Sequence, residues 1–194
     1  MNAGQKTLQR RQAAAPAQSD TTRQTLLNAA AELFITQGYT ATTVKQITAN
    51  AAISGSFYSH FTSKSDIGHA VADTWCQHTV ASLRHHTPSG VDELIESLIA
   101  WTENVISAPS WVRLECILAA DGPRGNRADR RFEQFQTTVT TLLAGVSAHT
   151  PSSPTVTLVC TALFGLLTRH AYVHAVSRAE IEDPIRFLVR YAVS

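Results

Sequence analysis

Hydrogen-bonding side chains are concentrated in residues 54–64, which read SGSFYSHFTSK. The stretch combines serine hydroxyls, a tyrosine phenol, an imidazole and a single lysine ammonium. Phenol, imidazole and ammonium groups hydrogen-bond anions such as phosphate, and small polar side chains let a backbone approach a partner closely. Residues 54–64 are therefore either a buried turn or a contact surface, and the neighbouring elements must decide between these.

Catalytic and metal-binding patterns are weak by comparison. The sequence has no glycine-rich phosphate loop, no GxSxG and no ExxH pair, which a helical enzyme would need in some form. Asp66, His69 and Asp73 share one helical face, and His170 and His174 are four apart, so either set could offer metal ligands. We expect both sets to be polar surface or interface, and we expect no cofactor, no metal and no enzymatic activity.

Composition favours a globular protein, and the charge balance differs between its first third and the remainder. Residues 1–64 carry six basic and two acidic side chains, whereas residues 65–194 carry ten basic and thirteen acidic ones. A basic first third suggests a nucleic-acid face on a body with another task, although a solvated basic tail is the alternative.

Cys76, Cys116 and Cys160 are far apart and are expected to be reduced core thiols. The uncharged run 156–167 is too short to span a membrane.

Helix signals fill the first third and strand signals are almost absent. Apolar residues at 26, 27, 30, 33 and 34 predict an amphipathic helix that starts at Asp20 and closes at Gly38. Thr43 and Gln46 have the spacing of a capping box, which opens a short helix to about residue 50. A second short helix near 56–61 and a long helix from Ser63 to about 86 follow. This order predicts a helix-turn-helix unit that feeds a long fourth helix.

In a helix-turn-helix unit the second helix braces the third, and the third enters the major groove of DNA. Phe57 and Phe61 are four apart and would hold the third helix down, so Tyr58 and His60 would point outward to phosphates. Lys64, at the start of the long helix, would add a positive charge. The predicted DNA-contacting residues are Lys45, Ser54, Gly55, Ser56, Tyr58, His60 and Lys64.

Three motifs carry a family resemblance. They are Leu26-x-x-Ala29-Ala30-x-x-Leu33-Phe34-x-x-x-Gly38-Tyr39, Thr42-Thr43-Val44-x-x-Ile47 and Phe57-Tyr58-x-His60-Phe61-x-Ser63-Lys64. In this order and spacing, residues 23–75 resemble the DNA-binding domain of the TetR family of bacterial transcriptional regulators. The resemblance implies nine helices, phosphate contacts by the equivalents of Thr43, Tyr58, His60 and Lys64, base readout at the start of helix three, and dimerisation through the last two helices.

The chain departs from the family pattern in the turn before the third helix. From Ile47 to Tyr58 it is one residue shorter than usual, and the absent residue is often basic. Ser65 stands where glutamate commonly follows the lysine. Because Phe57, Phe61 and Lys64 keep the family spacing, we place the change in the turn, where it affects base contacts more than phosphate contacts.

The remainder predicts five more helices. Ser89 caps the first, whose apolar side has Val91, Leu94, Ile95, Leu98 and Trp101; the next three lie at about 110–120, 128–148 and 154–177, and the last starts at Asp183-Pro184 and runs to the end. The arginines of the RGNRADRR stretch are expected to be solvated, with Asp129 and Glu133 as partners. The helix at 154–177 has apolar residues on more than one side, so it needs a second buried surface in addition to the core. A two-fold partner subunit is the simplest second surface, and a single buried helix in a monomer is the alternative. The expected dimer-interface residues are Phe164, Leu167, Phe187 and Tyr191.

Three tryptophans lie in three different body helices. Such residues pack a core or wall a ligand cavity, which is mostly apolar and aromatic, and the resemblance implies a pocket for a small effector. The expected pocket residues are Trp75, Trp101, Trp111 and Phe164.

The expected fold is all-α, with about nine helices. A disordered basic arm (1–19) precedes a helix-turn-helix DNA-binding domain (20–64) and a helical effector-binding and dimerisation domain (65–194). The expected function is that of a ligand-responsive DNA-binding transcriptional regulator, a repressor that a small-molecule effector releases from its double-stranded operator. We expect a cytoplasmic homodimer without membrane contact; a helical-bundle enzyme or metal-binding protein is the alternative.

Overall fold

Short-range signals in the sequence form the first helices. Thr43 and Gln46 make the predicted capping box: the Gln46 amide donates to Thr43 Oγ1 (3.2 Å), and the Thr43 amide donates to Gln46 Oε1 (2.8 Å). Gly38 has a φ of 85°, the left-handed conformation expected just after a helix. Tyr39 packs its ring against Phe34 at 5.2 Å between centroids. These contacts fix where the first helix ends and the second begins.

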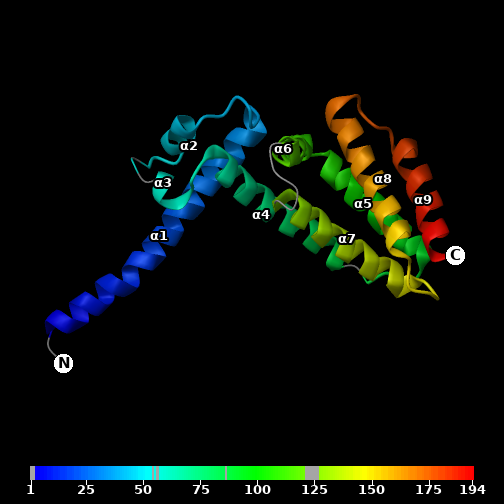
Figure 1. Ribbon diagram of the computed structural model, residues 1–194, viewed down its shortest axis with the longest axis horizontal. Helices are drawn as coiled ribbons and strands as arrows, with labels where there is room; N and C mark the ends of the chain where they lie inside the picture. The colour runs from blue at the N-terminus through cyan, green and yellow to red at the C-terminus, as the bar shows by residue number, and fades with distance from the viewer. Residues whose placement is uncertain (1–2, 54, 56, 86, 121–126) are drawn as a thin grey trace. The chain divides into compact units, whose positions relative to one another are not determined.

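The computed structural model describes residues 3–53, 55, 57–85, 87–120 and 127–194, with side chains from residue 19 onward. Within these residues the chain is all-α, with nine helices and no strand, which confirms the predicted fold class (Figure 1). The helices are α1 (Ala3–Thr36), α2 (Val44–Asn50), α3 (Phe57–His60), α4 (Lys64–Arg84), α5 (Val91–Ile106), α6 (Pro109–Ala120), α7 (Arg127–Val146), α8 (Ser153–Tyr172) and α9 (Arg178–Val193).

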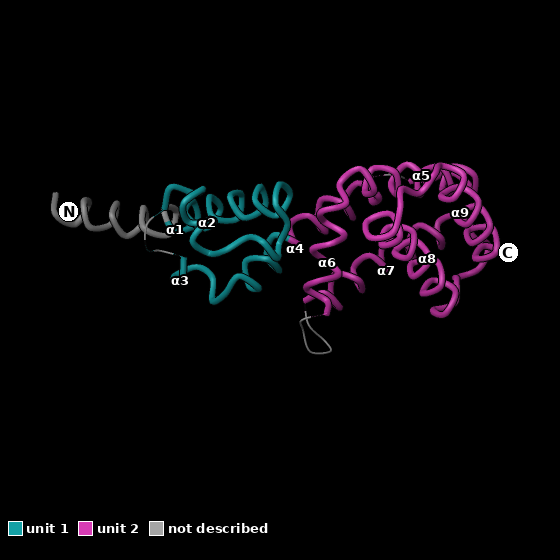
Figure 2. Tube along the Cα trace, turned by 90° about the horizontal axis from the view of Figure 1, so that it is seen from above, with its two compact units in different colours: residues 1–71 teal, residues 72–194 magenta. Residues whose placement is uncertain are grey.

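The chain divides into two compact units, which we call the head (Met1–Val71) and the body (Ala72–Ser194) (Figure 2). The expected boundary fell between residues 64 and 65, so the head takes in the first residues of α4 as well. The Lys64 ammonium bonds to backbone carbonyls of the loop after α1, and Ile67 and Val71 are buried. These residues tie the start of α4 to the head.

The head has a small core made by the predicted apolar positions. Leu26 and Phe34 of α1, Ile47 of α2, and Phe57 and Phe61 at the third helix are all buried. Two buried phenylalanines anchor a helix of only four residues, which has little stability of its own. Tertiary packing therefore fixes the position of α3.

Helix α1 begins earlier than the sequence signals indicate. It is continuous from Ala3 to Thr36, so Asp20 lies inside it and does not cap its start. The expected disordered arm, residues 1–19, is helical from Ala3 onward. This segment is rich in alanine, glutamine and arginine, which have high helix propensity.

The turn between α2 and α3 has an unusual residue. Ala52 adopts a φ of 52°, in the left-handed region that favours glycine. The Ala52 amide donates to the Ala49 carbonyl (3.1 Å), and the Ile53 amide donates to the Thr48 carbonyl (3.0 Å). This pair of bonds is a Schellman motif, which ends α2 with an alanine at the position where glycine is most common.

The body packs α5 to α9 and most of α4 around one apolar core. Leu94, Ile95, Leu98 and Trp101 of α5 face this core, as predicted. Helix α8 ends at Tyr172, earlier than expected. Two starts differ from their predicted caps. Gly90, not Ser89, is the cap residue of α5, and α9 begins after Ser177, so that Pro184 lies inside it.

None of the described helices combines the length and the hydropathy required to span a bilayer.

Candidate nucleic-acid interface and body cavity

Helix α3 presents one aromatic side chain to solvent and buries two others. Phe57 and Phe61 are 2 % exposed, whereas Tyr58 between them is 73 % exposed. The Phe57 ring meets the Tyr58 ring edge-on at 5.2 Å, which restricts the phenol's position. His60, at the end of α3, is half-buried. The predicted division into anchoring and outward-facing aromatics is therefore confirmed for Tyr58 and partly for His60.

The other predicted DNA-contacting residues lie before α3. Thr43 and Lys45 are exposed at the start of α2, where backbone N–H groups and the helix dipole favour an anion. Gly55 is exposed and has a φ of 83°, a conformation that only glycine adopts without strain. Ser54 and Ser56 lie outside the described residues.

Lys64 is engaged inside the head. Its ammonium donates to the carbonyls of Tyr39 (3.1 Å) and Thr42 (3.0 Å), and it lies 4.4 Å from the centroid of the Tyr39 ring. These contacts satisfy most of what an ammonium can donate. A phosphate contact by Lys64 stays a prediction, and in this structure the side chain holds the loop after α1 against the start of α4.

The body encloses an aromatic-walled cavity of about 270 Å³. Trp101 stacks on Phe135 at 5.1 Å, and Phe132 meets Phe164 edge-on at 6.4 Å. The Trp101 indole donates to the Thr79 carbonyl (3.0 Å), so its polar edge is satisfied by the protein. The cavity therefore offers a ligand mostly aromatic and aliphatic surface.

Three of the four expected pocket residues line this cavity: Trp75, Trp101 and Phe164. Trp111 does not; it stacks on Trp75 at 5.7 Å. Leu167, which was expected at a dimer interface together with Phe164, also lines the cavity. The structure thus places both α8 residues toward the inside of the body.

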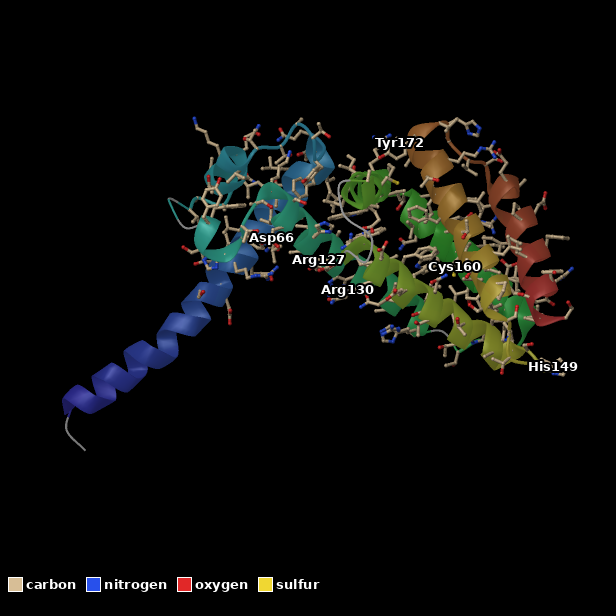
Figure 3. The ribbon with its side chains drawn as sticks, viewed as in Figure 1. Asp66, Arg127, Arg130, His149, Cys160 and Tyr172 are labelled. Atoms are coloured by element: carbon tan, nitrogen blue, oxygen red, sulfur yellow. The ribbon has the colours of Figure 1, made fainter. Side chains whose placement is uncertain are left out.

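Sequence reasoning missed a network of ionic bonds at the cavity wall. Arg131 binds Glu115 through two nitrogens, Nε to Oε2 (2.9 Å) and Nη2 to Oε1 (3.0 Å), and donates from Nη1 to Asp73 Oδ1 (2.7 Å). Arg127, labelled on α7 in Figure 3, binds the other oxygen of Asp73. The network, which we call the Arg131 clamp, joins α4, α6 and α7.

The Arg131 clamp corrects the prediction for the RGNRADRR stretch. The Arg131 side chain is only 5 % exposed, so it is not solvated, and its partners are Asp73 and Glu115. Arg124 lies outside the described residues. A signal was present in the sequence: Arg131 is three residues after Ala128 and four before Phe135, on the buried stripe of α7.

Burial shifts the acid–base properties of several groups near the cavity. It raises the pKa of Glu115, although the guanidinium of Arg131 acts in the opposite direction. Burial also raises the pKa of Cys76, at the cavity wall, to about 11, and that of Cys160, labelled on α8 in Figure 3, to about 12. Both thiols are protonated at neutral pH, as expected for reduced core cysteines.

The residues of the two candidate metal patterns have protein partners. Asp66 accepts from the Thr62 amide (2.9 Å), and Asp73 belongs to the Arg131 clamp. His170 Nδ1 accepts from the Val176 amide (3.2 Å), and the His174 ring contacts Arg169. Across the described residues, no group of three or more potential ligands is placed to hold a metal ion.

The last helix carries an exposed aromatic face. Phe187 and Tyr191, both expected at a dimer interface, are 70 % and 60 % exposed, and their rings are parallel within 9°. Arginines of the same helix bond to acidic residues of α5: Arg178 to Glu103, Arg186 to Glu96 and Arg190 to Asp92. These ion pairs hold α9 to the body while its aromatic face stays uncovered.

Comparisons with known proteins agree with this architecture. Residues 26–71 match the family model described as "Bacterial regulatory proteins, tetR family". No curated protein matches the chain.

Solved structures match over most of the chain. A transcriptional regulator of Streptomyces coelicolor A3(2) is 17 % identical and superposes with a TM-score of 0.71 over 87 % of this chain and 98 % of its own. A TetR-family regulator of Syntrophomonas wolfei is 19 % identical, with a TM-score of 0.66 and coverages of 91 % and 97 %. GusR of Salmonella enterica is 20 % identical, with a TM-score of 0.65 and coverages of 89 % and 95 %.

At these identities the structural likeness defines the fold, and the family model identifies the head. Residues 26–71 of the head match the model of the TetR family of bacterial regulatory proteins, and the chain shares the all-helical fold of solved transcriptional regulators.

Proposed function

We propose that this protein is a ligand-responsive transcriptional repressor that binds operator DNA as a homodimer and is released by a small molecule. The observation that carries the proposal is Tyr58: a 73 % exposed phenol on a helix held by two buried phenylalanines, inside the family-matched segment. An exposed tyrosine on an anchored third helix is suited to a DNA-backbone contact. Such a regulator works in the cytoplasm, where its operator is.

DNA docking rests on exposed groups from two helices of the head. Tyr58 of α3 can hydrogen-bond a phosphate, and Lys45 of α2 supplies a positive charge that no described ion pair neutralises. The Thr43 hydroxyl donates to Gln46 Oε1 (2.8 Å), so a phosphate contact by Thr43 would replace that bond. Phosphate contacts fix the register of α3 in the major groove, and base contacts near Gly55 add sequence preference. Ser54, Ser56, His60 and Lys64 remain predicted contacts.

Homodimerisation is supported by the exposed face of α9. Phe187 and Tyr191 form an aromatic pair that water covers in the single subunit, and Leu158 of α8 is another exposed large apolar residue. Burying such a pair against its symmetry copy releases apolar surface from water. A dimer would supply the two heads that helix-turn-helix proteins use to read two half-sites.

The effector would bind in the cavity of the body. Trp75 and Cys76 of α4 line this cavity, and the same helix begins at Lys64 in the head. A ligand that favours one position of α4 changes the equilibrium between two states of the protein, provided that it binds them with different affinity.

The test is DNA binding measured by fluorescence anisotropy, with DNA from upstream of the protein's own gene and several salt concentrations. Wild type should bind with a steep salt dependence because counterions leave the DNA. Tyr58→Phe removes one hydrogen bond to a charged group from each subunit, so it should weaken binding of the dimer about a hundredfold. Lys45→Ala removes one positive charge from each of the two heads, so it should lower the slope of log K against log salt by about 1.8.

Lys64→Ala removes the same charge as Lys45→Ala, but from a lysine that also bonds inside the head, so the two variants are compared in stability as well as in DNA binding. Lys64 bonds to the carbonyls of Tyr39 and Thr42, so its loss should destabilise the head by about 1 kcal/mol, a value reduced for its partial exposure. Lys45→Ala should leave the unfolding midpoint unchanged. Salt-independent or absent DNA binding by wild type would refute the proposed function.

A further inference from the structure

The cavity of the body has four properties that together restrict its ligand: its aromatic lining, its satisfied polar groups, its paired charges and its size. The first is its aromatic lining. Trp75, Trp101, Phe132 and Phe164 all face it. Flat rings of this kind offer faces and edges to another aromatic ring, and such contacts add to simple apolar burial.

The second property is that the buried polar atoms of the wall are already hydrogen-bonded within the protein. Among the residues that the structure describes, every buried side-chain nitrogen and oxygen has a hydrogen-bond partner. The Trp101 indole uses its N–H on the Thr79 carbonyl. A ligand therefore gains little by offering further donors or acceptors to the buried wall, and it loses the hydration of any that it brings.

The third property is the pairing of charge at the wall. The charged residues that line the cavity are Arg131, Glu115 and Asp129, the last at an exposed position of α7. All three side-chain nitrogens of Arg131 donate to carboxylates of the Arg131 clamp. Glu115, whose side chain is 15 % exposed, has both oxygens bonded to the same guanidinium. An anionic ligand would have to displace a carboxylate from Arg131, and a cationic ligand would have to compete with Arg131 for Glu115. Each exchange leaves a buried charge without its partner.

Size gives the remaining limit. A cavity of 150 Å³ in another protein holds benzene, and this cavity has a volume of about 270 Å³. It therefore suits about two fused rings, on the order of ten to fourteen non-hydrogen atoms.

We propose that the effector is an uncharged, flat aromatic compound of about two fused rings, and that the Glu115–Arg131 pair excludes charged analogues. This inference rests on the proposed function, because it names the chemical class of the effector that the body cavity would take. Glu115 is a specificity-determining residue in this scheme: its negative charge neutralises Arg131 and so removes the attraction for an anion.

The experiment compares three probes of one shape by isothermal titration calorimetry without DNA: 2-naphthol, 2-naphthoate and 2-naphthylmethylammonium. For wild type we expect 2-naphthol to bind at least tenfold more tightly than either ion. Equal or tighter binding of an ion would overturn the proposal, as would failure of 2-naphthol to bind.

The variant Glu115→Gln keeps a hydrogen-bond acceptor for Arg131 and removes the negative charge. It should bind 2-naphthoate at least about tenfold more tightly than wild type does, because the Arg131 clamp then has two guanidiniums and one carboxylate, Asp73. Glu133→Gln, at an exposed position of the same helix as Arg131, is the matched control and should leave all three affinities unchanged. An unchanged 2-naphthoate affinity in folded Glu115→Gln would contradict the role of Glu115.

Thiol labelling locates the probe even if Glu115→Gln does not fold. Cys76 lines the cavity, whereas Cys116 is half-buried and does not. Saturating 2-naphthol should slow iodoacetamide labelling of Cys76 in wild type several-fold and leave that of Cys116 unchanged, as read by peptide mass spectrometry. Unchanged labelling of Cys76 would place the probe elsewhere and overturn the proposal.

The outcomes separate this inference from the proposed function. Salt-dependent DNA binding together with failure of 2-naphthol to bind would support the proposed DNA-binding function and refute the proposed effector class. Binding of 2-naphthol together with absent DNA binding would support the ligand specificity of the cavity and refute the proposed function.

Discussion

Among the residues that the structure describes, Ala52 has the backbone conformation least suited to its side chain. Its φ of 52° places Cβ close to the following carbonyl, a contact that costs an L-residue roughly 1 kcal/mol or more and costs glycine nothing. The hydrogen bonds of the Schellman motif hold it there. The strain lies in the shortened turn that positions α3.

Replacing Ala52 by glycine should therefore stabilise the protein. We expect Ala52→Gly to raise the free energy of unfolding by about 1 kcal/mol, since the side chain is exposed and no packing is lost. Ala49→Gly, three residues earlier within α2 and also exposed, is the control and should lower it by a similar amount. Urea denaturation followed by circular dichroism measures both, and a shift of the same sign in both variants would contradict the role of the left-handed turn.

The start of α9 shows how one element is positioned by competing signals. Asp183-Pro184 has the form of a helix start, yet the capping box of Ser177 and Glu180 opens the helix about one and two-thirds turns earlier. A capping box satisfies two backbone N–H groups, whereas Pro184 costs one hydrogen bond of the helix interior. Contacts along the extra turn, such as Arg178 to Glu103, accompany the earlier start.

Ser177→Ala should lower the free energy of unfolding by about 1 kcal/mol at neutral pH. Hydrogen bonds from the Ser177 backbone and side chain, and then the charge of Arg169, lower the pKa of Glu180 below its usual 4.5. A lowered carboxyl pKa stabilises the fold above the unfolded-state value, and this contribution is lost as pH falls through the folded-state value. The difference between Ser177→Ala and wild type should therefore shrink below about pH 4.5.

Thermal denaturation over a pH series measures this difference. Ser153→Ala, beside the cap residue of α8, is the control and should change stability by less than about 0.5 kcal/mol. A Ser177→Ala effect that did not vary with pH would contradict the part assigned to Glu180.

Local patterns predicted most elements, and they failed where distant partners decide. The Thr43 capping box, the left-handed Gly38 and the burial of Phe57 and Phe61 all follow from spacing within one or two turns. The Arg131 clamp does not, since its carboxylates come from two other helices, 58 and 16 residues away along the chain. Lys64 is similar: its acceptors lie 25 and 22 residues earlier. The sequence shows that these residues are charged, but it does not show which distant residues they bond to.

At the scale of the whole molecule, the proposed dimer depends on a face that one subunit leaves exposed. Phe187 and Tyr191 lie one turn apart on α9, and the arginines of that helix bond to α5. The charged side chains of α9 therefore lie on the side of the helix that faces α5. The aromatic pair can then pack against its symmetry copy without burying an unpaired charge.

Phe187→Asp should convert the dimer to a monomer. The substitution removes apolar area from the proposed interface and places two like charges near each other across the two-fold axis. Sedimentation velocity measures the mass, and DNA affinity should fall together with dimerisation. Ile35→Ser, which replaces an exposed apolar residue of α1, is the control and should stay dimeric. A Phe187→Asp protein of unchanged mass would exclude α9 from the interface.

All three tryptophans belong to the body, and the head contains none. Trp75 and Trp111 are stacked on each other, and Trp101 is stacked on Phe135, so intrinsic indole fluorescence reports only on the body. The head can be followed separately through the tyrosine signal of a variant that lacks Tyr172 and Tyr191. The order in which the two units melt is therefore accessible in one unlabelled sample, from the emission of indole against that of phenol.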